Sequence, residues 1–184
     1  MSDPPAVTPD YFQILVVREL RKVGFDVGAA RVHRRSELPE PERGFVVELQ
    51  IPLSRSGSTW RVLAACRRQS GSVGRDVIES VKTRLPEVPA DVGLVFATSD
   101  FTAEAVTAAQ GAGVALLRLV DGRSAFDMSG WSTPGHYPAW LPAHMAQLVD
   151  RDPAGQPRLR SLEAGKPEII LDILSSKTGR ALSS

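Results

Sequence analysis

Two apolar segments of strand length, separated by a short turn, constrain the fold of this chain more than any other feature. The first runs over residues 44–52 and the second over residues 60–67. Residues 54–58, which lie between them, contain the Ser-Gly pair typical of a β-hairpin turn. The second segment is a run of small and apolar residues, which suits a central strand, and it leads into a polar, basic cluster. The pair therefore predicts an antiparallel hairpin inside a sheet.

Helical and strand patterns alternate around this hairpin. A helical stripe begins after Pro9 and ends at Gly24, and a second stripe covers residues 77–85. Short apolar strands are expected at residues 93–97 and 114–120, with a helix over 101–110 between them. From residue 60 onward the order is strand, helix, strand, helix, strand. This order predicts an α/β fold, in which right-handed crossovers place helices on the faces of a mixed sheet.

The remaining segments divide the chain into a core and its appendages. We expect a disordered N-terminus at 1–8, a core domain over 9–121 and a C-terminal extension over 122–184. Within the core, the pattern predicts an extended segment up to about residue 33, followed by a loop to residue 43. The extension is predicted to begin with an aromatic, proline-rich loop (131–142) and a short helix (139–149). A polar linker (151–166), an apolar segment (167–174) and a polar tail (175–184) follow. The apolar segment is predicted to be an edge strand or a docking segment, packed on its own domain or on a partner.

Composition excludes several classes of protein. The single cysteine, Cys66, excludes an internal disulfide and fits a reducing compartment. The three histidines are scattered and give no metal-ligand spacing. No apolar run approaches the roughly 18 residues that a membrane span requires, and the N-terminus lacks the pattern of a signal peptide. We therefore expect a cytoplasmic protein without membrane contact.

Charge is distributed unevenly along the chain. The net charge is only +1, yet residues 31–75 contain nine arginines against four glutamates. Such a local excess is the electrostatic footprint of a surface that binds nucleic acid, and it is equally typical of a solvated arginine-rich face. The glycine-containing loop at 71–74 lies among Arg67, Arg68 and Arg75, so its amides are candidates for cradling a phosphate.

The order of elements resembles that of a known family. The helix over 11–23, the hairpin, the Cys66-Arg67-Arg68 strand end and the later Thr98-Ser-Asp-Phe-Thr-Ala-Glu-Ala105 segment resemble Mrr-type restriction endonucleases, a family of the PD-(D/E)xK nuclease superfamily. The likeness spans about residues 9–121. It implies a restriction-endonuclease-like core, and it suggests a role in restriction or phage defence.

The resemblance also implies where a catalytic site would lie. Active members carry a glutamate on the first helix, an aspartate on one hairpin strand and Glu/Gln-x-Lys on the next. Two carboxylates then bind Mg²⁺, which activates water, while the lysine offsets charge on the phosphate. In this chain the corresponding residues are degenerate: Gln13, Gln50, Ala65 and Arg67. A register shifted by two residues makes Glu48 the strand acid instead, and strand alternation places it on the same side as Gln50.

These substitutions predict a protein that does not cleave nucleic acid. The leading expectation is a pseudonuclease, a nucleic-acid-binding or assembly module that needs no cofactor and contacts phosphates through Arg67, Arg68, Arg75 and Gln50. One alternative is an active Mg²⁺-dependent endonuclease that uses Glu48, Arg67 and a second carboxylate such as Asp76 or Glu79. Another is a protein-interaction subunit or homo-oligomer, with contacts through 131–149 and 167–174.

Overall fold

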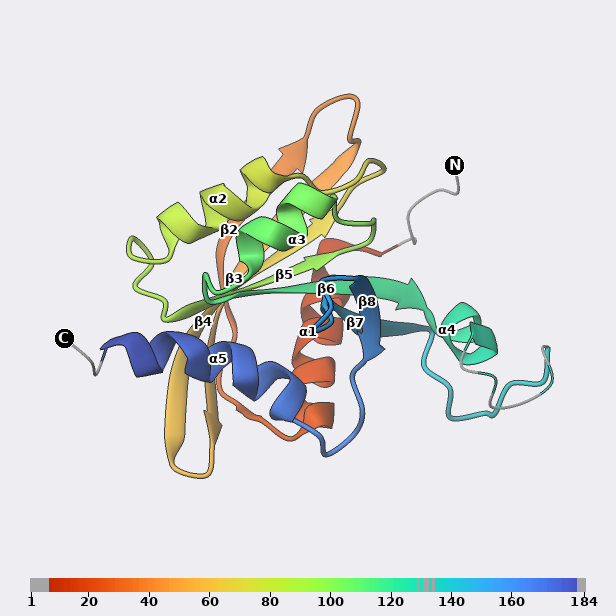
Figure 1. Ribbon diagram of the computed structural model, residues 1–184. Coiled ribbons are helices and arrows are strands. Elements are labelled where there is room, and N and C mark those ends of the chain that lie inside the picture. The colour runs from red at the N-terminus through yellow and green to blue at the C-terminus, as the bar shows by residue number, and fades with distance from the viewer. Residues whose placement is uncertain (1–6, 129, 131–132, 134, 182–184) are drawn as a thin grey trace.

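A mixed sheet of eight strands organises the part of the chain that the computed structural model describes, namely residues 7–128, 130, 133 and 135–181 (Figure 1). The side chains of residues 175–181 are not described. The helices are α1 (Pro9–Val23), α2 (Arg75–Arg84), α3 (Ala103–Ala109), α4 (Gly122–Met128) and α5 (Glu168–Ala181). The strands are β1 (Asp26–Val27), β2 (Arg31–Leu38), β3 (Gly44–Arg55), β4 (Ser58–Arg68), β5 (Val92–Ala97), β6 (Val114–Asp121), β7 (His144–Arg151) and β8 (Pro157–Ser161).

The strand order confirms the predicted α/β class. Along the sheet the order is β1-β3-β4-β5-β6-β7-β8, and β2 also pairs with β3. Strands β4, β5 and β6 are parallel, joined by crossovers through α2 and α3, whereas the pairs at both ends of the sheet are antiparallel. Helices α2 and α3 cover one face, and α1 and α5 cover the other (Figure 1). This is the arrangement of a restriction-endonuclease-like core.

The central hairpin forms as its sequence predicts, with strands that are longer than expected. Strands β3 and β4 pair in continuous register from Phe45 with Arg68 to Arg55 with Ser58. Both turn residues have positive φ, 50° at Ser56 and 82° at Gly57, as a type I′ turn requires. Because this turn matches the twist of the flanking strands, it fixes which β3 residue lies opposite which β4 residue.

Helix α1 is specified at both ends. The Thr8 hydroxyl caps the first turn by accepting from the Tyr11 N–H at 3.2 Å, and Pro9 occupies the first turn. Gly24 ends the helix with φ of 111°, and its N–H donates to the Arg21 carbonyl. Between the caps, the apolar stripe is buried against the sheet, as the spacing predicts: Phe12, Leu15, Val16, Leu20 and Val23.

Two hydrophobic cores lie on the two faces of the sheet. On the α1 face, Leu49 of β3 and Ala64 of β4 pack with the helix. On the α2 face, Leu63 and Ala65 of β4 pack against Ile78 of α2. Successive residues of β4 thus alternate between the cores, which is the strand period of two. The same alternation decides the face on which each polar residue of the hairpin lies.

The N-terminal third differs from expectation in two places. Residues 34–38, predicted as a loop, continue β2 as a strand paired to β3. The charged residues of this segment have low strand propensity, which led to the prediction of a loop. They lie on an exposed edge strand, where backbone hydrogen bonds to β3 determine the conformation. In the predicted disordered N-terminus, Val7 is buried and Thr8 caps α1, while residues 1–6 lie outside the described part of the chain.

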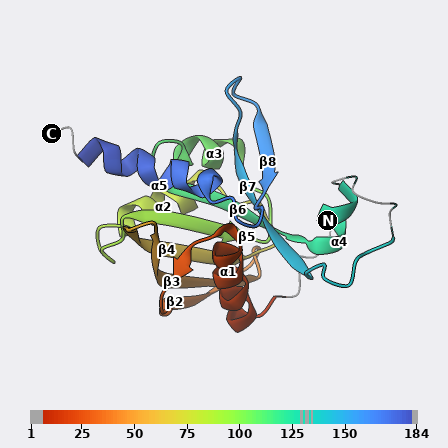
Figure 2. The same ribbon diagram turned by 90° about the horizontal axis from the view of Figure 1, so that it is seen from below.

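The C-terminal extension is more structured than predicted. The expected helix at 139–149 is wrong: residues 144–151 form β7, which pairs with β6. The expected polar linker contains β8, which pairs with β7. Figure 2 shows this β7–β8 hairpin projecting away from the other strands. The predicted aromatic loop is described only in part, since residues 131, 132 and 134 lie outside the described residues.

The apolar segment at 167–174 is a helix rather than an edge strand. It begins α5, and Ile170 and Leu174 are fully buried in the core that α1 also covers. These side chains are therefore used by the chain's own fold, which corrects the expectation of an edge strand and favours packing on its own domain over docking. No described helix combines the length and the apolar character that a membrane span requires.

Candidate nucleic-acid interface and candidate nuclease site

Most of the predicted site residues share one face of the central hairpin. Because β4 sends Ala65 toward α2, strand alternation places Arg67 on that face too. Across the ladder, Glu48 pairs with Ala65 and Gln50 pairs with Leu63, so both β3 residues also face α2. The structure therefore brings Gln50, Ala65, Arg67 and Glu48 together beneath helix α2.

Gln13 is separated from this group. It lies on α1, the helix that packs on the opposite face of the sheet, and its side chain is half-buried there. Arg68 also differs from its neighbour Arg67, since alternation along β4 directs it toward the α1 face. Two of the residues assigned to one site by sequence thus belong to the other side of the sheet.

Glu48 is the carboxylate of this face, and it is already paired. Its Oε1 accepts a hydrogen bond from Nη1 of Arg84 in the last turn of α2, with 2.5 Å between the atoms. The Glu48 side chain is 9% exposed and that of Arg84 is 17% exposed, so the ion pair is largely shielded from water. The second oxygen, Oε2, is buried without a hydrogen-bond partner. A buried carboxylate in this state depends strongly on the cation that it contacts.

Arg84 is a site residue that the sequence analysis missed. A signal was available, because Arg84 lies three residues after Val81 and next to Leu85, both on the buried stripe of α2. A cation at that helical spacing points along the sheet-facing side, where it needs a carboxylate. Glu48 of β3 provides that carboxylate.

Gln50 is held by the loop that follows α2. Its Nε2 donates to the backbone carbonyl of Val88 at 3.2 Å. This bond gives the Val88 carbonyl, which follows the helix, a hydrogen-bond partner, and it holds the Gln50 side-chain amide against the sheet. Gln50 therefore serves the packing of α2, which limits its availability for a phosphate.

Arg67 occupies a half-buried position between the hairpin and the start of α2. Its Nε donates to Oε1 of Gln69 at 2.9 Å. Burial lowers the pKa of the Arg67 guanidinium, and the carboxylates of Asp76, Glu42 and Glu48 partly offset that effect. An arginine remains charged even so, and a partly desolvated guanidinium binds a phosphate more strongly than a fully hydrated one.

A divalent metal would find an unsuitable set of donors here. Magnesium in nuclease-like sites takes carboxylates together with substrate phosphate oxygens. On this face, Ala65 offers no ligand and the Glu48 carboxylate is neutralised by Arg84. Within the described ranges, no three His, Cys, Asp or Glu side chains gather closely enough to hold a metal ion. The residues present do not fit Mg²⁺.

Strand β2 extends the same face with exposed arginines. Arg31 pairs with Gln50 and Arg34 pairs with Glu48, so both side chains lie on the α2 face of the sheet. A β-bulge at His33 allows two residues three positions apart to face the same way. Arg31 and Arg34 are exposed, whereas Arg35 faces the other side and pairs with Asp10 of α1 at 2.7 Å. We call Arg31, Arg34 and Arg67 the basic strand surface.

The loop at 70–74 is less suited to a phosphate than its sequence indicates. The N–H groups of Ser70 and Val73 already donate to the carbonyls of Glu42 and Asp100, at 3.0 and 2.8 Å. Arg75, the first residue of α2, is exposed and pairs with Glu79 at 3.5 Å. Lys82 lies near the same carboxylate at 3.1 Å and lowers the pKa of Glu79. Arginine side chains, rather than loop amides, dominate this surface.

Cys66 is inert in this fold. It points away from Arg67 into the α1-side core, as strand alternation predicts, and it is fully buried. Burial raises the pKa of the Cys66 thiol well above its ordinary range. A reactive thiolate beside the arginines is therefore excluded.

A comparison with known families agrees with this fold. The family model of the Mrr catalytic domain, described as a restriction endonuclease, matches residues 5–128. The match includes α1, the central hairpin, both crossover helices and α4, but not β7, β8 or α5. Searches of curated proteins and of solved structures gave no match.

Proposed function

The chain belongs to the Mrr-type restriction endonuclease family, and from this premise we propose that it is a non-cleaving member that binds nucleic-acid backbone through the basic strand surface. The observation that carries the proposal is the pairing of Glu48 with Arg84 beside an exposed row of arginines. The first feature removes the carboxylate that cleavage needs. The second provides cations for phosphates.

Binding is supported by the position of the arginines. Arg31 and Arg34 lie on an exposed edge strand, and Arg67 lies two strands away on the same face. A guanidinium presents donors in a fixed fork that matches two phosphate oxygens. Contacts of this kind position a nucleic acid by its backbone, with little readout of base sequence.

The absence of cleavage follows from the donor set of the same face. Arg84 already places a positive charge at the Glu48 carboxylate, where an active member would place Mg²⁺. Arg67 stands where a lysine would help to orient water, and it cannot exchange a proton as a tuned lysine can. We therefore propose binding without a metal cofactor.

Nucleic-acid binding can be measured by fluorescence anisotropy with labelled double- and single-stranded DNA and RNA, over a salt series. We expect affinity to fall steeply with salt, because phosphate contacts release counterions. The double variant Arg31→Gln/Arg34→Gln should weaken binding to all sequences alike. Each lost contact should reduce the slope of log affinity against log salt by about 1.

The matched control is Arg61→Gln. This residue also lies on the hairpin and is exposed, but it forms a bidentate pair with Asp91 at 2.9 and 3.3 Å. Its loss should leave affinity unchanged. Equal losses in both variants, or binding that does not respond to salt, would contradict the proposed surface.

One observation favours an active nuclease as the second candidate. Among the acids considered as a second metal ligand, Asp76 interacts electrostatically with Arg67, whereas Glu79 is engaged by Arg75 and Lys82. A displaced Arg84 would leave Glu48 and Asp76 as the two carboxylates. Divalent-dependent cleavage that disappears in Asp76→Asn would establish this alternative.

A further inference from the structure

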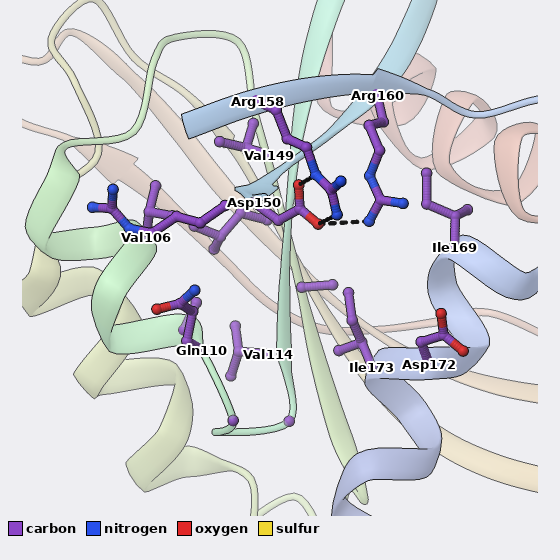
Figure 3. A pocket seen from close by; sticks show the side chains of 16 residues that line it. Val106, Gln110, Val114, Val149, Asp150, Arg158, Arg160, Ile169, Asp172 and Ile173 are labelled. Atoms are coloured by element: carbon purple, nitrogen blue, oxygen red, sulfur yellow. Dashed lines mark hydrogen bonds and ion pairs between the residues drawn. The ribbon is translucent and has the colours of Figure 1, made fainter. Parts of the chain in front are cut away.

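A cavity of about 400 Å³ opens at the other end of the sheet, where the β7–β8 hairpin departs from β6 (Figure 3). Helix α3 borders it on one side and α5 borders it on the other. Its volume lies within the range of small-molecule sites, which typically begins near 300 Å³. The matching family model covers neither β8 nor α5, so two of the cavity's walls lie outside the matched region.

The floor of the cavity is apolar. Aliphatic side chains from four elements line it, and Figure 3 shows them facing the open space: Val106, Val114, Val149, Ile169 and Ile173. Ile173 and Ile169 are only partly buried, although their neighbours Ile170 and Leu174 are in the core. An apolar surface that the fold leaves partly uncovered gains free energy when an apolar group covers it.

One wall carries an excess of positive charge. Oδ1 of Asp150 accepts from Nε of Arg158 at 2.7 Å, and Oδ2 accepts from Arg158 and Arg160 at 3.0 and 2.5 Å. Two guanidinium groups thus share one carboxylate. Moreover, Nε of Arg160 is buried without a hydrogen-bond partner. The side chains that line the cavity include three arginines, Arg151, Arg158 and Arg160, against two carboxylates, Asp150 and Asp172, and this excess of positive charge favours an anion.

The charged side chains are placed unevenly around the cavity. Asp172 of α5 lies below Arg160, and Gln110 of α3 lies across the cavity from it (Figure 3). The Asp172 carboxylate repels an anionic head group on its own side, so the head group is directed toward Arg158 and Arg160. An apolar group attached to such a head group would reach Val114 and Ile173.

From this arrangement we propose that the cavity binds a small organic anion, with a phosphate or carboxylate head on the Arg158–Arg160 wall and an apolar body on the aliphatic floor. The site is independent of the proposed nucleic-acid surface, because it lies on β6–β8 whereas the basic strand surface lies on β2–β4. A free metabolite and a phosphorylated nucleic-acid end share this head-group chemistry.

The probe for this site is 1-naphthyl phosphate, which joins an apolar ring to a phosphate. Titration into the ¹⁵N-labelled full chain should shift the amide signals of residues 114, 149, 160 and 173. The intact probe should bind at least tenfold more tightly than 1-naphthol or inorganic phosphate alone. The naphthol can contact only the apolar floor, and the phosphate can contact only the arginine wall.

Two variants test the two halves. Arg160→Gln removes the unsatisfied donor while Asp150 keeps Arg158, and it should weaken the probe about tenfold. Ile173→Ser should weaken it severalfold by removing part of the floor. Arg61→Gln, which removes an arginine from an exposed carboxylate pair elsewhere, and Arg67→Gln, which alters the basic strand surface, should leave probe binding unchanged.

The outcomes separate this proposal from the proposed function. No binding at millimolar probe, or binding that Arg67→Gln abolishes and Arg160→Gln spares, would overturn the cavity site without affecting the nucleic-acid surface. If the probe binds as expected, competition with oligonucleotides identifies the natural ligand. Displacement of the probe by a 5′-phosphorylated oligonucleotide, but not by its 5′-hydroxyl form, assigns the site to nucleic-acid ends. Failure of both oligonucleotides to displace a bound probe supports the site and assigns it to a free organic anion.

Discussion

Arg84 of helix α2 places its guanidinium 2.5 Å from the carboxylate of Glu48, which lies on the strand directly opposite Ala65. This ion pair connects the helix to the sheet face where the family resemblance predicts a metal site. Under the proposed function, Glu48 serves as a packing contact between helix and sheet. The pair is shielded from water, so its two partners depend strongly on each other.

Removing one partner of this ion pair should lower the stability of the fold strongly, whereas replacing both partners should change it little. We expect Glu48→Gln to lower the free energy of unfolding by about 3 kcal/mol, because Arg84 loses its counter-charge. The double variant Glu48→Leu/Arg84→Leu should unfold within about 1 kcal/mol of wild type, since an apolar pair avoids the desolvation cost. Urea unfolding measures both. Glu87→Gln, at an exposed glutamate after the same helix, is the control and should have little effect; equal stability of all variants would contradict a buried pair.

Close backbone packing at the start of β3 gives a second prediction. A Cβ atom added to Gly44 would lie 1.7 Å from the carbonyl oxygen of Arg68, so the hairpin must distort. We expect Gly44→Ala to destabilise the fold by about 2 kcal/mol, as overpacking does. At Gly71 the nearest atom would be the Glu42 carboxylate at 4.0 Å. Gly71→Ala should therefore be tolerated in thermal unfolding, and a comparable loss there would argue against the Gly44 contact.

The thiol of Cys66 should be silent in the native protein. It is buried, and that burial raises the pKa of Cys66, so almost no thiolate exists near neutral pH. At pH 8, a thiol reagent should label Cys66 in the folded chain no faster than the chain unfolds. In denaturant, the same reagent should label Cys66 at once. Rapid stoichiometric labelling of folded protein would show that the strand alternation at Cys66 is misassigned.

His144 should make stability depend on pH. Burial lowers the pKa of His144, and Arg18 adds to this, while Asp121 opposes it. The unfolded chain, with a histidine pKa near 6.5, therefore binds a proton before the folded chain does. Stability should be highest above that pH and should fall as the pH drops from about 6.5 toward the folded pKa. NMR titration of the ring reports the shift directly, and His144→Phe should flatten the pH dependence of unfolding.

The central hairpin could be predicted because its signals are local. Alternating residues set the two faces of β3 and β4, and the Ser56-Gly57 turn set the register. Once the register is known, the grouping of Glu48, Gln50, Ala65 and Arg67 follows. The family resemblance, read from these same segments, is confirmed by the match over residues 5–128.

The C-terminal elements could not be read in the same way. Residues 144–148 favour helix by propensity, yet tertiary pairing with β6 makes them a strand. Residues 168–174 favour strand through their isoleucines, but Ile170 and Leu174 are buried at helical spacing and Pro167 precedes the first turn. The burial of Glu48 by Arg84 also escaped prediction, because the two residues are 36 positions apart.

A cleavage assay is the most direct test of the central claim that this family member binds nucleic acid without cutting it. Labelled DNA and RNA would be incubated with the protein at concentrations that saturate binding, in Mg²⁺, Mn²⁺ or EDTA, with Glu48→Gln and Asp76→Asn as comparison variants. The account predicts bound but intact substrate under every condition. Metal-dependent products that disappear in Glu48→Gln would contradict it, and would show that Arg84 releases Glu48 to a metal when substrate binds.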